Sequence, residues 1–308
     1  MLSSSVPSSQ LTQLMQALDA EMPFSGASAW DNVGLLIEPP GAHTSSQNFG
    51  VLFTNDVTPA VLAEAATAFN GSPARAIISY HPTPFAPLKK FNLSSSAARV
   101  VLECASMNIA LISPHTAWDA AVGGLNDWLL AGIVTALSTS VSTSGPIKRA
   151  VGDAGIRGVG DGRVGVLSDA VTLADAINAV KNHLRLDTVQ VSLPAGESGA
   201  AAASSGAAAV AAAAADIPVR AIAVCAGSGA SVLAGFAGAD VWITGEMSHH
   251  DLLAAAAAGV SVILTQHSRC ERGFLPIVIE RLKVRLLGTG NNYNFAIAEL
   301  DADPLTTL

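Results

Sequence analysis

Three histidines and two carboxylates in this 308-residue chain have the residue types and the spacing of metal ligands. His115 and Asp119 are four residues apart, and His267 and Glu271 repeat that spacing. Two residues four apart on a helix share one face. His81 ends an apolar stretch, and both pairs also follow such a stretch. Because Zn, Fe and Mn accept imidazole and carboxylate ligands, these five residues predict a site for divalent metal.

A metal at such a site would activate water for hydrolysis, and a bridging carboxylate would allow two ions about 3.5–4 Å apart. A single His-carboxylate pair can equally be a helix cap or a surface ion pair. The pattern occurs twice here, with a third histidine at a comparable position. The repetition favours the metal site over the structural alternatives.

The segment from Glu246 to Asp251 offers candidates for proton transfer. Glu246 could act as a general base, or it could only place a negative charge at the start of a helix. His249 and His250 are adjacent, so at most one of them can point into a site. We predict Glu246 and His250 as catalytic candidates, with helix capping and packing as the alternative role.

Three further side chains are expected to play no part in the chemistry. Cys270 lies between His267 and Glu271, where a thiolate ligand is conceivable, but a buried thiol is the better prediction. His43 and His183 do not follow strand-like segments and are predicted to be ordinary surface residues.

Short apolar runs alternate with helical patterns, which predicts an α/β fold. Strands are predicted at 50–53, 76–79, 109–112, 163–167, 188–193, 220–224, 241–243 and 260–264. Helices are predicted at 10–21, 95–107, 124–133, 173–184, 248–258 and 271–282. The Ser- and Thr-rich segment 138–146 reads as a connector, and the Ala-rich segment 198–216 reads as a flexible insertion. The donors at 81, 115 and 267 directly follow predicted strands, the place where α/β sheets bind ligands.

Composition narrows the class of protein. Charged residues make up only 13% of the chain, against roughly 25% in an average soluble domain. With 16 Lys and Arg against 24 Asp and Glu, the net charge is −8, which argues against direct nucleic-acid binding. The hydrophobic fraction of 50% excludes a disordered chain. Two uncharged stretches, 128–147 and 221–239, reach the length of a membrane span, but their Ser, Thr, Gly and Pro content favours a chain outside the membrane.

The N-terminal segment and the cysteines indicate the cytoplasm. No Lys or Arg precedes Arg75, so the first residues lack the basic start of a secretory signal and the arginines of a transit peptide. The three cysteines are widely spaced, which predicts neither a disulfide framework nor a CxxC zinc site.

Taken together, several segments resemble the NIF-three-like family, named after the NGG-one-interacting factor. They occur in the family's order and are Trp30–Leu35, Ser79–Phe85, His115–Asp119 running into Gly123–Asp127, Thr244–Asp251 and His267–Arg272. Bacterial members are often labelled GTP cyclohydrolase I type 2 homologues. Many of them have a second histidine where this chain has Tyr80, and the Tyr-His-Pro form resembles eukaryotic members.

The resemblance implies a single domain over 8–308, built as two interlocked α/β lobes with a dinuclear metal site between them. We expect one lobe from 8–137 plus 218–308, and a middle segment at 146–217 that contains the Ala-rich insertion. The family's ligands correspond to His81, His115, Asp119, His267 and Glu271, the same residues that the spacing selects. Because this chain has Tyr80 in place of an imidazole, we expect either one or two ions per subunit.

Two classes of function follow from the resemblance and the residues. The first is a metal-dependent hydrolase of a nucleotide-like or other small substrate, similar to the GTP cyclohydrolase I type 2 homologues. The alternative is a non-catalytic interaction protein with a structural metal centre, a partner of a transcription factor, or a protein that stores or delivers metal. The family resemblance also implies a homo-oligomer, a toroidal hexamer or a dimer.

Overall fold

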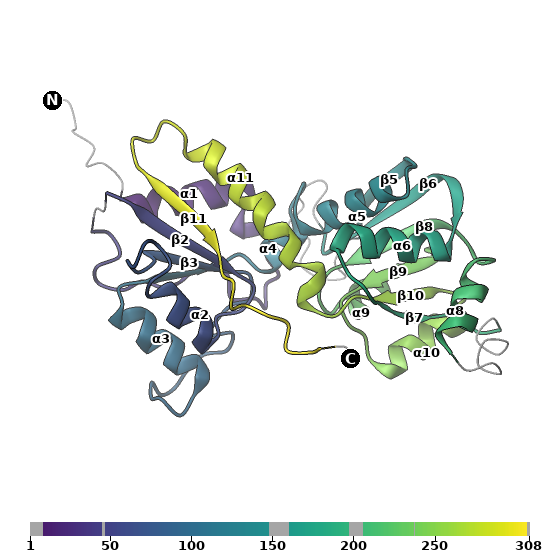
Figure 1. The fold of residues 1–308 in the computed structure, drawn as a ribbon, viewed down its shortest axis with the longest axis horizontal. Coiled ribbons are helices and arrows are strands. Elements are labelled where there is room, and N and C mark those ends of the chain that lie inside the picture. The colour runs from purple at the N-terminus through teal and green to yellow at the C-terminus, as the bar shows by residue number, and fades with distance from the viewer. Residues whose placement is uncertain (1–8, 45–46, 148–159, 197–205, 237, 307–308) are drawn as a thin grey trace. The chain divides into compact units, whose positions relative to one another are not determined.

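The computed structural model describes residues 9–44, 47–147, 160–196, 206–236 and 238–306, and it divides into two compact units (Figure 1). Unit 1 comprises the chain up to Trp118 together with Phe274–Ala302. Unit 2 comprises Asp119–Gly273 and the C-terminal residues from Asp303. Each unit contains its own sheet, with helices on both faces.

The sheet of unit 1 has five strands in the order β1-β4-β3-β2-β11. The strands are β1 (Gly34–Ile37), β2 (Phe49–Thr54), β3 (Ala76–Ser79), β4 (Ala110–Ser113) and β11 (Tyr293–Ile297). Strands β4, β3, β2 and β11 run parallel, and β1 pairs antiparallel with β4. Every residue of β2, β3 and β4 is buried, as expected for parallel strands covered on both faces.

Two pairs of helices cover the sheet of unit 1 (Figure 1). They are α1 (Gln10–Glu21) with α11 (Leu275–Leu286) on one face, and α2 (Pro59–Ala65) with α3 (Ser96–Ser106) on the other. In α1, the spacing of Leu11, Leu14 and Leu18 brings all three to one buried face. The α2–α3 side packs Val61, Leu62, Val100 and Cys104 against Leu52, Ile77 and Leu111 of the strands.

The sheet of unit 2 has six strands in the order β5-β6-β8-β9-β10-β7. The strands are β5 (Val141–Ile147), β6 (Gly162–Thr172), β7 (Gln190–Ser192), β8 (Pro218–Cys225), β9 (Val241–Thr244) and β10 (Ser261–Leu264). The three central strands β8, β9 and β10 are parallel, and the three outer strands pair antiparallel. The loops that follow β8, β9 and β10 therefore leave the same edge of the sheet.

Helices also cover both faces of the second sheet (Figure 1). They are α5 (Leu125–Ala136) and α6 (Leu173–Leu184) on one face, and α9 (Ala230–Leu233) and α10 (His249–Ala257) on the other. Helix α6 begins with a capping box, in which Thr172 and Asp175 exchange hydrogen bonds. The short helix α4 (Thr116–Ala120) carries the chain from unit 1 into unit 2.

Three features of the fold differ from the sequence-based expectation. The predicted connector at 138–146 contains edge strand β5, whose Pro146 is tolerated because an edge strand has a free side. Within the predicted insertion, residues 207–214 form helix α8 (Ala207–Ala214), which follows the helix propensity of alanine, and 197–205 lie outside the described residues. The helix predicted at 271–282 begins four residues later, as α11 (Leu275–Leu286), because Pro276 favours a helix start there and the preceding residues form 3₁₀ turns.

No helix among the described residues combines the length and apolar character that a membrane span requires.

Candidate metal centre

Parallel pairing brings several donor residues of unit 1 to one edge of its sheet. Asp56 follows β2, His81 follows β3, and His115 follows β4, and these three strands are neighbours. The carboxyl ends of adjacent parallel strands meet at one edge, so the three side chains lie close together. The rings of His81 and His115 have centroids 5.5 Å apart.

Each of these two histidines has one ring nitrogen held by a carboxylate. Nδ1 of His81 lies 3.0 Å from Oδ1 of Asp56, and Nδ1 of His115 lies 2.8 Å from Oδ1 of Asp31. A carboxylate accepts a hydrogen bond, so the proton of a neutral ring resides on Nδ1. The Nε2 lone pair is then available, and this is the arrangement that orients histidine ligands in metal sites.

The carboxylate of Asp31 is fully buried and connects two segments of unit 1, its own loop and the turn of His115 and Thr116. It accepts hydrogen bonds from the backbone N–H of Asn32 at 2.8 Å, from the N–H of Thr116 at 3.1 Å, and from the Thr116 hydroxyl. Burial is the largest influence and raises its pKa. The hydrogen bonds from His115 and Thr116, together with the charge of the imidazole, outweigh burial and leave the pKa below its usual value. Asp31 is therefore ionised at neutral pH, and its carboxylate accepts the hydrogen bond that orients the His115 ring.

At one donor residue and directly before another, the backbone adopts a conformation that L-residues rarely use. His115 has φ +35°, and Gln266, directly before His267, has φ +70°. Non-glycine residues with positive φ persist where the surrounding structure fixes them, and they cluster at functional sites. At His115, the backbone N–H bonds the carbonyl of Tyr80 at 3.2 Å while the ring bonds Asp31.

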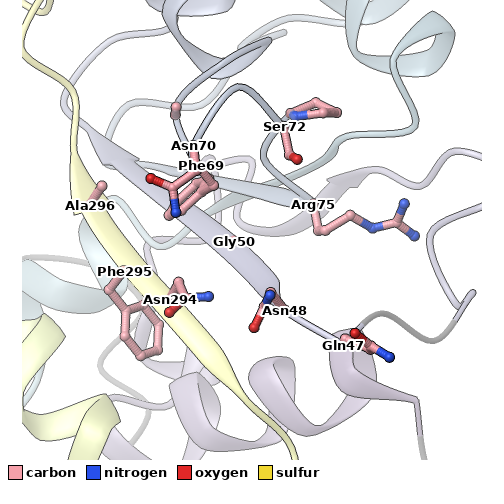
Figure 2. Close-up of a pocket in the computed structure, with 12 residues that line it drawn as sticks. Gln47, Asn48, Gly50, Phe69, Asn70, Ser72, Arg75, Asn294, Phe295 and Ala296 are labelled. Carbon is pink, nitrogen blue, oxygen red and sulfur yellow. The ribbon is translucent and has the colours of Figure 1, made fainter.

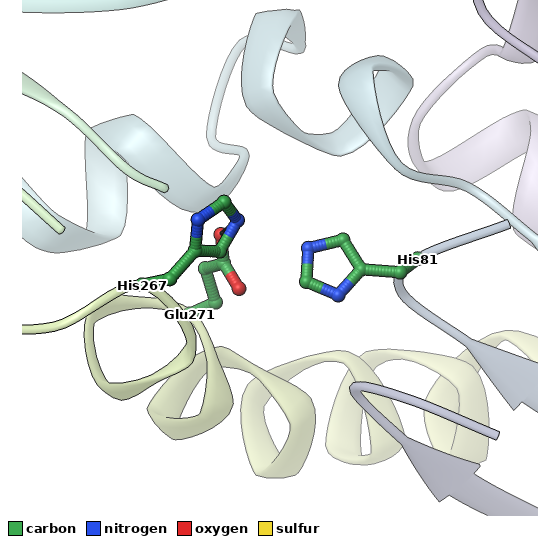
Figure 3. A group of neighbouring side chains, drawn as sticks. All are labelled: His81, His267 and Glu271. Atoms are coloured by element: carbon green, nitrogen blue, oxygen red, sulfur yellow. Dashed lines mark ion pairs between the residues drawn. The ribbon is translucent and has the colours of Figure 1, made fainter. Parts of the chain in front are cut away.

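In unit 2, the loop after β10 carries a histidine and a glutamate whose donor atoms converge. Nε2 of His267 lies 3.5 Å from Oε1 of Glu271, which is only 2% exposed, and Figure 3 draws these side chains together with His81 of unit 1. Nδ1 of His267 lies 3.0 Å from the carboxylate of Glu246. The third histidine thus repeats the arrangement of the other two, with a carboxylate on Nδ1, and its Nε2 faces Glu271.

The space in front of these two donors depends on a glycine. Gly227 follows β8 with φ +64°, and a Cβ at this position would lie 2.7 Å from Oε1 of Glu271 and 3.1 Å from Nε2 of His267. A side chain would therefore occupy the space that both donor atoms face. Two ligands of one tetrahedral ion, each about 2.1 Å from it, are roughly 3.4 Å apart, so the 3.5 Å separation fits shared ligation.

Acidic groups are concentrated near the carboxyl end of β8. The pKa of the Cys225 thiol is raised well above its usual value, first by burial and then by the charges of Asp119, Asp161 and Glu271. Burial and the charge of Glu271 also raise the pKa of Cys270. Without a metal both cysteines are therefore neutral thiols, and Cys270 is buried, as predicted. Carboxylates grouped around neutral thiols are balanced best by a cation.

A buried asparagine fixes the position of Asp119 within unit 2. Asn126 donates to the carbonyl oxygen of Asp119 at 3.3 Å, and its own carbonyl accepts from the backbone N–H of Ala226 at 2.9 Å. The turn that contains Asp119 is in this way attached to the loop after β8. That loop also contains Gly227, which lies against Glu271 and His267.

The remaining candidates lie in different environments. The carboxylate of Glu246 is exposed and contacts His267, whereas His250 lies on the exposed first turn of α10 with its ring against His249. Tyr80 is buried, with its ring against those of His81, His115 and Trp118.

The two histidines expected at the surface differ from each other. His43 is exposed and bonds Ser9 and Glu38, as predicted. His183 is half-buried against the ring of Trp128, with centroids 4.4 Å apart, so its prediction as an ordinary surface residue is wrong. The cause is the close approach of α5 and α6, where Gly132 leaves room for the imidazole.

Sequence reasoning did not assign a ligand-orienting role to Asp31, Asp56 or Gly227. Asp31 accepts a hydrogen bond from the N–H of Asn32, as the side chain of a turn residue does. Asp56 directly follows a buried strand, the same signal that selected the histidines. Only the pairing of distant strands shows that these carboxylates face imidazoles.

A pocket in unit 1 lies away from these donors. It has a volume of about 740 Å³ and lies near the amino ends of β2 and β11, and none of the predicted site residues lines it. Figure 2 shows Phe69 beside Gly50 and the amides of Asn48 and Asn294 along the strands. The carboxyl ends of the strands, where the histidines lie, are at the opposite end of the sheet.

A known family model matches nearly the whole chain. The model described as Duf34/NIF3 (NGG1p interacting factor 3) matches residues 9–304. The chain belongs to the DUF34/NIF3 family. It is similar to NIF3-like protein 1 of Drosophila melanogaster, with 35% identity over 303 residues, 97% of this chain and 89% of that protein. It is also similar to Protein NIF3 homolog of Schizosaccharomyces pombe, with 36% identity over 283 residues, 92% of each chain.

A solved DUF34/NIF3 structure has the same fold. The Bacillus cereus protein related to NIF3 superimposes with a TM-score of 0.73 at 20% identity, covering 99% of this chain and 100% of that chain. The two sheets with helices on both faces are therefore an arrangement of the DUF34/NIF3 fold.

Proposed function

We propose that this chain binds divalent metal through His81, His115, Asp119, His267 and Glu271, and that it is a metal-dependent hydrolase of a nucleotide-like small substrate. One observation carries the proposal. Each of the three histidines has Nδ1 within 3.0 Å of a carboxylate, which is the partner that orients histidine ligands in metal sites.

The residues present suit a divalent cation. Imidazole and carboxylate oxygen are the donors that Zn, Fe and Mn share. The glycine at 227 leaves the space in front of His267 and Glu271 open. When bound, such a metal polarises substrate oxygens and activates water. The chain's own part is to hold the imidazoles in one tautomer and orientation through Asp31, Asp56 and Glu246.

Proton transfer in this proposal falls to residues of the loop after β9 and the start of α10. The carboxylate of Glu246 is more than half exposed, at 57%, so it can exchange a proton with solvent while it contacts His267. His250, four residues further on, is also exposed, and imidazole is the side chain that most often transfers protons in enzymes. We propose Glu246 and His250 as the groups that relay protons between substrate and solvent.

The number of ions depends on Tyr80. Its ring lies 5.6 Å from that of His115 by centroids, where a second imidazole would add a nitrogen donor. We propose one firmly bound ion per chain, with a second ion held more weakly.

The experiment that tests the proposal combines metal analysis with a hydrolase screen. Purified protein is assayed by ICP mass spectrometry and then against phosphoesters, nucleotides and cyclic amides. Glu271→Gln is compared with the matched control Glu280→Gln, whose exposed carboxylate bonds Lys283 on α11. The proposal expects that Glu271→Gln keeps the fold but loses metal and turnover, while Glu280→Gln keeps both.

Two outcomes would contradict it. Protein that binds no divalent metal at millimolar concentration would overturn the ligand assignment. Metal-loaded protein with no turnover, whose Glu271→Gln variant still binds a protein partner normally, would instead indicate the interaction role that the family description, NGG1p interacting factor 3, suggests.

A further inference from the structure

Two exposed aromatic rings stand beside His115 in unit 1. Trp30 is 65% exposed and Phe85 is 55% exposed. Their ring centroids are 6.1 Å apart, and each ring also lies near the His115 ring, at 6.1 Å for Trp30 and 6.4 Å for Phe85. Both aromatic rings thus border a histidine that the proposed function assigns to the metal.

The loops that carry these rings are firmly anchored although the rings themselves are exposed. Asp31 bonds His115 and Thr116, and Asn32 donates to the carbonyl of Pro84 at 2.7 Å, which joins the loop of Trp30 to the loop of Phe85. The N–H of Ser28 bonds the Thr116 hydroxyl at 2.9 Å. Exposing a large aromatic ring to water is unfavourable in free energy, and a ligand that covers the ring would remove this unfavourable contribution.

The other three tryptophans are used differently. Trp118 and Trp242 are buried, and Trp128 is half-buried against His183. Trp30 is therefore the tryptophan with a large free surface. Rings of this kind bind planar ligands by stacking, because an aromatic face interacts with the face or edge of another ring.

We infer that Trp30 and Phe85 form a stacking platform for the planar heteroaromatic ring of the substrate, such as a nucleobase. The inference rests on the proposed function for the location of the reacting group. A ring stacked on Trp30 would lie beside His115, so a group attached to it could reach the metal ligands of unit 1. The exposed apolar surface here consists of two rings, and its proximity to a donor histidine favours a small planar ligand over a protein partner.

Isothermal titration calorimetry with nucleoside monophosphates tests the inference. Adenosine and guanosine 5′-monophosphate are the probes, and ribose 5-phosphate is the control that lacks the ring. We expect the nucleotides to bind more tightly than ribose 5-phosphate. Trp30→Ala should weaken nucleotide binding roughly 5- to 150-fold, the value of one base–aromatic stack. Trp30→Phe, which keeps a ring, should restore most of the affinity.

Phe91→Ala is the matched control, because Phe91 is another exposed aromatic residue of unit 1, at 58% exposure. It should leave nucleotide binding unchanged. The inference is overturned if the nucleotides bind no better than ribose 5-phosphate, or if Trp30→Ala leaves their affinity unchanged. It is also overturned if sedimentation shows that Trp30→Ala dissociates a wild-type oligomer, because the rings would then be an interface between copies.

Metal content measured on the same samples separates this inference from the proposed function. Nucleotide binding that depends on Trp30 in protein without metal would support the platform while it contradicts the hydrolase. Metal-loaded, active protein whose affinity for substrate does not depend on Trp30 would contradict the platform alone.

Discussion

The carboxylate of Asp31 and the imidazole of His115 are joined by a 2.8 Å hydrogen bond across 84 residues of sequence. Asp31 precedes β1 and His115 follows β4, and the antiparallel pairing of Gly34 with Ser113 brings these two loops together. A turn residue thereby becomes the group that fixes the tautomer of a predicted metal ligand.

Asp31→Asn should weaken metal binding about 10- to 100-fold, as loss of such an outer partner does in other sites. An amide can present its N–H₂ to Nδ1 and favour the opposite tautomer. Calorimetric titration with Zn²⁺ or Mn²⁺ measures the affinity, and ¹⁵N spectra of His115 in metal-free protein report the tautomer. Asp175→Asn, which removes the exposed cap of α6, is the control and should alter stability without altering metal affinity. Unchanged affinity in Asp31→Asn would show that the hydrogen bond only braces the loop.

Glu246→Gln separates two roles of one carboxylate. If Glu246 mainly positions His267, metal affinity should fall about 10-fold or more in the variant. The reason is that a neutral amide replaces the carboxylate that lies 3.0 Å from Nδ1. If it mainly transfers protons, metal affinity should persist while turnover falls about 10²- to 10⁴-fold. Metal titration and steady-state kinetics on the same variant decide between these roles. His250→Ala should affect turnover alone.

Gly227→Ala should abolish or strongly weaken metal binding. Its Cβ would lie 2.7 Å from Oε1 of Glu271, and φ +64° is also unfavourable for alanine. Gly259→Ala is the control for the backbone effect alone. Its φ of +79° is likewise unfavourable for alanine, but no atom lies within 4 Å of the added Cβ. Both variants should lose about 1–3 kcal/mol in the free energy of unfolding. Only Gly227→Ala should lose metal, and equal metal content in the two would argue against the proposed location.

Tyr80→His should raise the metal content of the protein toward two ions per chain. The Tyr80 ring lies 5.0 Å from that of His81 and 5.6 Å from that of His115, so an imidazole in its place adds a nitrogen donor beside them. ICP mass spectrometry after dialysis against excess metal measures the ratio, and Tyr80→Phe serves as the control. A ratio of two in the wild-type chain would show that the tyrosine does not limit occupancy.

The stability of the protein should fall as the pH drops below the ordinary His183 pKa of 6.5, because burial lowers this pKa in the folded state. The unfolded state then binds more protons than the folded state, so protonation favours unfolding. Nε2 of His183 is buried without a hydrogen-bond partner among the described residues, which makes the charged form costly.

His183→Phe keeps a ring against Trp128 and should flatten this part of the pH profile. Urea unfolding of both proteins between pH 5 and pH 8 measures the effect as the difference between the two curves, which cancels the titration of the other histidines. Parallel curves would show that His183 does not titrate differently on folding.

The sequence alone determined the class of fold and the predicted ligands. Periodicity placed α1 and α6 at their observed bounds and located all the central strands of both sheets, because buried parallel strands and amphipathic helices leave local patterns of apolar residues. The spacing of His267 and Glu271 and the position of His81 after a strand were also local signals. Local patterns were weaker for β5 and α8, where Ser, Thr and Ala have no strong apolar period.

Only the tertiary structure decided which carboxylate faces which imidazole. Asp31 with His115, and Asp56 with His81, are pairs set by strand order and register, which bring together residues far apart in the chain. The same holds for Gly227, whose missing side chain matters because another loop places Glu271 against it. Hydrogen bonds between side chains of distant segments have no period in the sequence, so their partners are defined only when the strands pair.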